Sequence, residues 1–289
     1  MLAIRRPRLW PQLVRLIALA YAAIPAGIQA QDWAPNLTLT STWHDNATNA
    51  KPAADQISAL QFEADMVASK RFSVGRDDSL HPTAHFAGEW WPRFNGLNRA
   101  AAGARLEWRH KFGLGALAPV FSIEGGANVV AARESERRGT STVLLATIRK
   151  RINHALRFAL TQEFSDYNAR AAVFDRQGAE TAVEVGRDVT TSSRVTLRFS
   201  YRDGDVLSHA TPPRPDLVAL APNRVSIGTF GRELTAYSIE ARTFGARLGV
   251  VHAVDTDTAL MAVYEVRQTR REPLRYLNQL VSVAIVHQF

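Results

Sequence analysis

Apolar and polar residues alternate with a period of two through most of this chain, in segments of about ten residues. In segment 193–203, for example, Leu197 and Phe199 fall on one face and Arg198 falls on the other. Successive side chains of a β-strand point to opposite faces, so this pattern predicts strands and an all-β fold. We expect twelve of them, at residues 36–45, 57–71, 82–92, 100–112, 119–132, 140–151, 155–168, 178–189, 193–203, 233–254, 258–270 and 277–289.

The connections between these segments alternate in length. Short ones such as 151–154 and 255–257 are followed along the chain by longer ones. Short turns at one end and longer loops at the other are typical of a transmembrane antiparallel β-barrel, whose even strand number leaves both termini on one side. A soluble sandwich also alternates, with its polar faces outside, and periodicity alone does not separate the two folds.

The last thirteen residues, 277–289, favour the barrel. Leu277, Val281 and Ile285 share one face, and the chain stops on the aromatic Phe289. A membrane strand needs an aromatic side chain at the interface. This segment resembles the C-terminal strand of bacterial outer-membrane β-barrels. The resemblance implies that Phe289 is part of the signal read by the barrel-assembly machinery. Other aromatics at predicted strand ends fit interfacial girdles, namely Trp43, Trp90, Tyr201 and Tyr264.

The N-terminal segment predicts export. Four arginines up to Arg15 precede a short apolar stretch, 16–24, which is followed by Pro25 and the small residue Ala30. We expect a signal peptide at 1–30 that is cleaved after Ala30, leaving one barrel domain at 31–289. The predicted location is the bacterial outer membrane, with its lipid as a partner. The sequence holds no cysteine, so neither a lipidation site nor a disulfide framework is expected.

Charge argues against nucleic-acid binding. The formal net charge is +8, but the predicted signal peptide contains four arginines and no acid, so residues 31–289 carry 31 basic and 27 acidic residues. Arginines and acids are interspersed rather than gathered in one stripe, as a nucleic-acid partner would require. No metal-ligand spacing, phosphate-binding loop or nucleophile elbow is present, so we expect no metal, no cofactor and no catalytic residue.

The charged residues of the strands predict the lining of the barrel. An Arg or Lys near the membrane midplane costs about 2–4 kcal/mol when it faces lipid, so these side chains should point inward. Adjacent segments then carry complementary signs, and we expect Arg198 to pair with Glu184 or with another nearby acid. The predicted lining is Glu63, Asp65, Glu89, Arg105, Glu107, Arg109, Arg157, Glu163, Glu180, Glu184, Asp188, Arg194, Arg198, Arg202, Glu265 and Arg267.

Twelve strands lie between the barrels that side chains fill and those that hold an aqueous channel. The interior is therefore either a narrow charged pore or closed by its own ion pairs. A pore with this lining would admit small polar or charged solutes. The longest connection, about 203–232, either folds inward as a constriction or stays outside.

Two other functions remain open. Twelve-stranded barrels of similar size include a phospholipase and a lipid A deacylase. The phospholipase family has a His and a Ser two residues apart, and this chain has no His-Xaa-Ser; Ser208 and His209 are adjacent, so their side chains should diverge. The residues His44, Asp45 and Asn46 are typical of a turn rather than of a cation site. The third possibility is an accessory barrel for surface polysaccharide or protein export.

Overall fold

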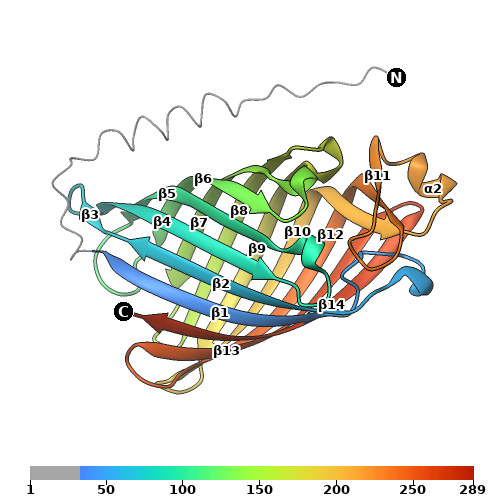
Figure 1. Ribbon diagram of the computed structural model, residues 1–289. Helices are drawn as coiled ribbons and strands as arrows, with labels where there is room; N and C mark the ends of the chain where they lie inside the picture. Colours follow the sequence, from blue (N-terminus) through green and yellow to red (C-terminus); the bar gives the residue numbers. More distant parts are fainter. Residues whose placement is uncertain (1–32) are drawn as a thin grey trace.

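The computed structural model describes residues 33–289, which form a closed antiparallel β-barrel with twelve wall strands (Figure 1). The predicted signal peptide lies outside the described residues. The fold class and the strand number predicted from the sequence are confirmed. The wall strands are β1 (Ala34–His44), β2 (Ala59–Ser69), β4 (Asp78–Trp90), β5 (Arg99–Lys111), β6 (Val120–Ala132), β7 (Gly139–Arg151), β8 (Leu156–Ala169), β9 (Arg176–Asp188), β10 (Ser193–Ala210), β12 (Leu234–Ala253), β13 (Thr258–Arg271) and β14 (Leu274–Gln288).

The barrel closes where the first wall strand pairs with the last. β1 runs antiparallel to β14, with Leu39 opposite Ile285, and β10 pairs directly with β12. Two short strands lie off this path: β3 (Phe72–Ser73) pairs with β4, and β11 (Asn223–Ile227) pairs with β12. Because every wall strand has two neighbours, the sheet leaves no open edge in the wall.

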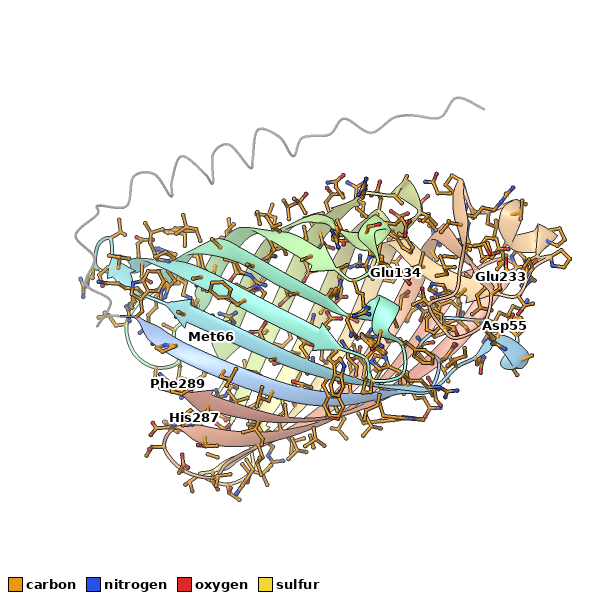
Figure 2. All side chains as sticks on the ribbon, viewed as in Figure 1. Asp55, Met66, Glu134, Glu233, His287 and Phe289 are labelled. Atoms are coloured by element: carbon orange, nitrogen blue, oxygen red, sulfur yellow. The ribbon has the colours of Figure 1, made fainter. Side chains whose placement is uncertain are left out.

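Apolar side chains cover the outside of the wall. Phe199 and Val283 are each 56% exposed, whereas Ala284, which points the other way, is buried. Met66 projects from the same outer surface, and Phe289 and His287 lie at one rim (Figure 2). An isolated soluble domain would bury such residues, so this belt fits contact with lipid.

The two ends of the barrel differ in their connections. One end, here the turn end, has short links at 152–155, 189–192 and 254–257, and both β1 and β14 have their free ends there. The other, the loop end, has longer links such as 45–58. Its shortest link is the two-residue turn Glu272-Pro273 between β13 and β14, and the turn end also has two eight-residue links, at 70–77 and 112–119. Short turns mark the periplasmic side of an outer-membrane barrel, so the loop end faces outward.

Helical structure among residues 33–289 is confined to short segments in the loop-end connections. These are the 3₁₀ turns η2 (Ala53–Asp55), η3 (Asn95–Leu97), η4 (Ser135–Arg137) and η5 (Ala172–Phe174), and the helix α2 (Pro215–Val218). No helix of the described chain is long and apolar enough to cross a membrane.

At the loop end, β10 and β12 extend beyond their neighbours. Pairing of β9 with β10 stops at Gly204, and pairing of β13 with β12 starts at Arg242, yet β10 and β12 stay paired out to Ala210. We call residues 205–241, which include α2 and β11, the cap. The predicted 203–232 connection is therefore wrong in extent: the sheet continues to Ala210, because Ser208 and His209 are held in the ladder with β12.

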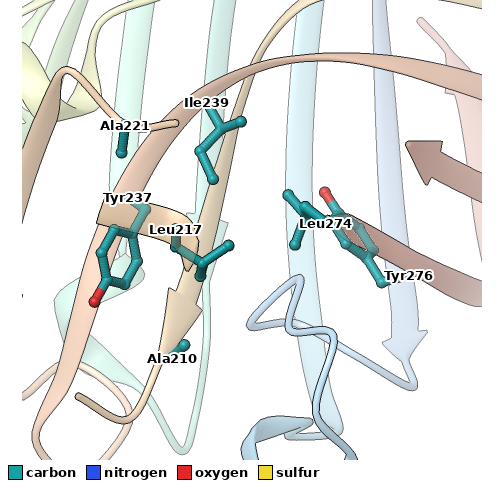
Figure 3. Close-up of a cluster of buried hydrophobic side chains, with 7 residues drawn as sticks. All are labelled: Ala210, Leu217, Ala221, Tyr237, Ile239, Leu274 and Tyr276. Atoms are coloured by element: carbon teal, nitrogen blue, oxygen red, sulfur yellow. The ribbon is translucent and has the colours of Figure 1, made fainter. Parts of the chain in front are cut away.

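The cap has a packed apolar core of its own (Figure 3). Tyr237 and Ile239 of β12 pack with Leu217 of α2 and with Leu274 and Tyr276 of β14. Further round the mouth, Phe230 packs on Phe94 of the β4–β5 connection, at 5.1 Å between ring centroids. Ala236 packs with Val173 and Phe174 of η5. These contacts come from several sides of the barrel, so the cap lies across its outer mouth.

Polar contacts tie the cap to the β1–β2 connection. The backbone N–H of His209 donates to the Thr48 carbonyl (2.9 Å), and Ser208 Oγ donates to the Asn49 carbonyl (2.8 Å). Buried Asp55 accepts two hydrogen bonds from Thr211, from the backbone N–H (3.1 Å) and from the hydroxyl (2.6 Å). A buried carboxylate is costly unless it accepts hydrogen bonds, so loss of the Thr211 contacts would be unfavourable. These contacts therefore hold the cap against the β1–β2 connection.

Candidate functional site: a charged cavity in the barrel

The barrel encloses a cavity of about 880 Å³, lined by side chains from strands all round the wall. Ten of the sixteen residues predicted as lining face it. They come from β2, β4, β5, β8, β9, β10 and β13, and each lies on the inward face set by strand alternation. These ten are Glu63, Asp65, Glu89, Arg105, Glu163, Glu180, Arg198, Arg202, Glu265 and Arg267.

The other six predicted residues share the inward register but lie closer to the turn end, outside the cavity. Five of them pair among themselves: Arg109 with Glu107 (2.5 Å), and both Arg157 (2.6 Å) and Arg194 (2.7 Å) with Asp188. Glu184 is the sixth, opposite Arg198 in the ladder. Near the turn end, the inner wall thus carries ion pairs within one strand or between neighbouring strands, and the cavity lies nearer the loop end.

The expected ion pair of Arg198 with a nearby acid is present, but its partner is not Glu184. Although these two residues are opposite in the register, the Arg198 guanidinium donates instead to Glu180, at 2.8 Å. A long guanidinium side chain leans along its strand, and here it reaches the acid four residues nearer the loop end. Glu180 is itself opposite Arg202, which donates to Ser165 Oγ at 3.4 Å rather than to an acid.

Several cavity charges have no ion-pair partner within the described chain. Glu63, Glu163 and Arg247 all line the cavity, and no described group of opposite charge lies within 4 Å of them. An ion buried in a dry interior without a partner costs several kcal/mol, whereas a hydrated ion does not. Unpaired charges of both signs therefore favour a water-filled cavity.

One polar network crosses four strands of the wall. His85 Nε2 lies 2.6 Å from Asp65, its Nδ1 lies 3.1 Å from the Asn128 side-chain oxygen, and the Asn128 amide donates to Ser141 (3.1 Å). Gly103 stands between His85 and Asn128 in the register, and a Cβ there would come within 2.7 Å of Asn128 Cα. The glycine thus leaves room for His85 to reach across β5.

Residues that the sequence reasoning missed gather near the loop end of the cavity. Arg99 and Arg176 lie at the first positions of their strands, just outside the segments predicted for them. Arg99 binds Glu89 through two guanidinium nitrogens. Alternation through 243–249 would have placed Arg247 inward. The cap residues Val206 and Leu207 had no such signal, because their strand was expected to end at 203.

The cap narrows the outer end of the cavity. Val206, Leu207 and Asn49 form part of the lining there, and a smaller space of about 130 Å³ lies beside them against Phe174 and Arg137. Burial lowers the pKa of Arg137, whose guanidinium packs over the Phe174 ring at 4.2 Å. The outer entrance is thus narrowed by apolar packing, whereas the cavity wall is charged.

Other chemistry has little support in the described chain. Ser208 and His209 each bind the β1–β2 connection instead of each other. Asp45 Oδ1 accepts a hydrogen bond from the Gln279 N–H, and Asn46 Oδ1 accepts one from the Ala50 N–H within the same turn. Among residues 33–289, no group of three or more metal-ligating side chains is found.

One Ser–His pair was not predicted, because it joins different strands. Ser193 Oγ lies 2.9 Å from His252 Nδ1 on the outer surface near the turn end. No described carboxylate contacts His252, so no third group orients the ring as a nucleophile's base would require. Thr258 and His287 form a similar pair at the same rim (3.1 Å), which makes both ordinary rim hydrogen bonds.

Solved structures with a similar fold include outer-membrane channels and porins. An outer-membrane channel from Pseudomonas putida F1 matches with a TM-score of 0.57 and 8% identity, over 92% of this chain and 99% of that one. The NanC porin matches with a TM-score of 0.47 and 7% identity (88% and 100% covered). The KdgM porin in complex with disordered oligogalacturonate matches with a TM-score of 0.44 and 11% identity (88% and 99% covered). No protein-family model and no curated protein matches the chain.

The first of these likenesses shows the fold. The chain has the architecture of bacterial outer-membrane β-barrels, which agrees with the location predicted from its alternation and its terminal strand.

Proposed function

We propose that the protein is a narrow outer-membrane channel for small polar or charged solutes. The observation that carries the proposal is the cavity of about 880 Å³ with unpaired charges of both signs on its wall. In a barrel that served only as an anchor, unpaired interior charges would have no use, because each must be hydrated to avoid destabilising the fold. The Pseudomonas structure of similar fold is named as a channel, which supports the same function here.

The lining suggests how solutes would be selected. Acidic Glu63, Asp65 and Glu89 lie on neighbouring strands β2 and β4, while Arg198, Arg202 and Arg247 lie on β10 and β12, across the barrel. Charges of opposite sign on facing walls orient a polar solute and disfavour an apolar one, which cannot replace the water it displaces. The cavity therefore suits a small hydrophilic molecule.

The cap makes this a gated channel. The cap core is apolar and joined to the rim by hydrogen bonds, so opening of these contacts would widen the outer entrance for a solute. Outer-membrane lipid is the partner of the apolar belt. The barrel-assembly machinery is the partner of Phe289, which is 69% exposed at the turn end and free to be recognised.

The test is ion conduction by purified protein in a planar bilayer. Wild-type protein should give small, discrete current steps. Arg198→Ala removes a cavity cation and leaves Glu180 without it, so the reversal potential in a salt gradient should shift toward cation selectivity. Arg187→Ala is the matched control, because Arg187 is exposed on the outward face of β9 and should leave selectivity unchanged.

The outcomes separate the functions. Absence of current in wild type and in a variant with residues 211–233 replaced by a short linker would contradict a channel and leave the accessory barrel as the function. Current that is equally selective in wild type and Arg198→Ala would show that the cavity wall does not face the permeation path.

A further inference from the structure

Three arginines stand side by side on the outer surface of the barrel near the loop end. Arg242 of β12 is opposite Arg270 of β13, and Arg270 is opposite Arg275 of β14. All three are exposed. Their neighbours face the other way: Thr243 and Thr269 share a hydrogen bond of 2.9 Å, and both line the cavity. The arginines therefore point away from the cavity, toward the surroundings of the barrel.

This row needs an explanation, because like charges directly opposite each other destabilise a sheet. Asp203 is opposite Arg242, and Glu240 lies two residues from it on the same face. Even so, no described carboxylate lies within 4 Å of any of the three guanidinium groups. The Arg270 guanidinium donates to the neutral side chain of Gln268. No acid of the described chain therefore forms an ion pair with the row, and Arg270 and Arg275 have no acid opposite them.

The row lies at the upper border of the apolar belt. Two residues further into the wall on the same face are Phe244, 48% exposed, and Leu277, 43% exposed. No long connection between β13 and β14 covers the outer surface here, because only the two residues Glu272-Pro273 join these strands. A lipid beside Phe244 and Leu277 would place its headgroup at the level of the guanidinium groups.

We propose that Arg242, Arg270 and Arg275 bind the phosphate of a phosphorylated lipid in the outer leaflet. Guanidinium groups donate paired hydrogen bonds to phosphate oxygens, and the apolar side chains below would contact the acyl chains. Three adjacent guanidinium groups suit a headgroup with more than one phosphate. The proposal depends on the barrel's orientation in the membrane and is independent of conduction.

The test measures lipid binding to detergent-purified protein by native mass spectrometry. The probes are bisphosphorylated lipid A, the same lipid after removal of its phosphates, and pyrophosphate alone. Wild-type protein should bind the phosphorylated lipid most tightly. The double variant Arg270→Gln/Arg275→Gln should bind it about 30-fold more weakly, at about fivefold for each charge near a membrane surface.

The matched control is Lys150→Gln/Arg187→Gln, which removes two exposed, outward-facing charges at the turn end and should leave lipid binding within about threefold of wild type. Unchanged binding in the Arg270/Arg275 variant, or an equal loss in the control, would overturn the proposal. The wild-type comparison needs no variant: equal affinity for the lipid without phosphates, or equally tight binding of pyrophosphate alone, would also overturn it.

Discussion

The wall of the barrel and its cap use the same alternating strands in opposite senses. In the wall, Phe199 and Leu248 face outward and Arg198 and Arg247 face the cavity. In the cap, the continuation of β12 turns Tyr237 inward, where it is buried among other apolar side chains. The wall resembles a soluble sheet turned inside out, and the cap is an ordinary soluble core. The surrounding medium, lipid or water, decides which face of a strand is apolar.

Tyr237→Ala should show the largest effect, because it removes a fully buried aromatic from the cap core. Large-to-small changes of this kind cost about 3–5 kcal/mol. Trypsin should then cleave the folded protein at Arg214, Arg224 or Arg232 at least about 100-fold faster, since cleavage follows the open population. Tyr264→Ala, on the lipid-facing wall, is the control. Equal cleavage rates in wild type and Tyr237→Ala would show that the cap is not a packed unit.

Asp55→Ala should weaken the attachment of the cap rather than its core. The change leaves the backbone N–H and the hydroxyl of Thr211 without their acceptor, which costs about 1–3 kcal/mol. Cleavage in the cap should rise less than in Tyr237→Ala. Asp55→Asn retains one accepting oxygen and should fall between Asp55→Ala and wild type. A rate for Asp55→Asn equal to that for Asp55→Ala would mean that the contact is purely ionic, with Arg232 as the partner.

Deletion of Phe289 tests the wall at the step of assembly. The side chain is exposed and packs on little besides the His287 ring (4.7 Å between centroids), so the folded barrel should lose less than about 1 kcal/mol. The yield of membrane-inserted protein in cells, measured as the band whose gel mobility changes on heating, should nevertheless fall. Phe112→Ala, another exposed aromatic at the turn end, should leave the yield unchanged. Normal insertion of the deleted chain would contradict a role in assembly.

Arg198→Ala should have the smallest effect on stability. If water fills the cavity, Glu180 is hydrated once its partner is gone, and the loss should stay under about 1 kcal/mol. A dry interior would make the same change cost about 3–5 kcal/mol. The midpoint of thermal unfolding distinguishes the two, and a large drop would show that the cavity residues form a closed, ion-paired interior.

The sequence predicted the wall well because one simple rule governs it. Period-two alternation predicted eleven of the twelve strands to within about four residues, and the inward face of ten cavity residues, but it ended β10 seven residues too early. It predicted an acidic partner for Arg198 without deciding which acid, because register gives the opposite residue and not the one that a long side chain reaches. It missed Arg176 because the charge falls at the edge of a segment.

The cap could not be predicted in the same way. Leu217, Ala236 and Tyr237 carry no pattern that says whether their segment stays outside or folds across the mouth. That outcome depends on contacts with Thr48, Asp55, Phe94 and Phe174, which come from other loops far along the chain. Local periodicity holds no information on such long-range packing.

The central claim, that the wall faces water inside while the cap excludes it, can be tested by thiol labelling. The chain has no cysteine, so each introduced one is unique. In membrane-embedded protein, Ser200→Cys, in the cavity, should react with a small water-soluble maleimide, whereas Phe199→Cys, facing lipid, should not. Ser208→Cys, buried in the cap, should react only when Asp55→Ala is added. Protection of Ser200→Cys equal to that of Phe199→Cys, or free reaction of Ser208→Cys in the otherwise wild-type chain, would contradict the account.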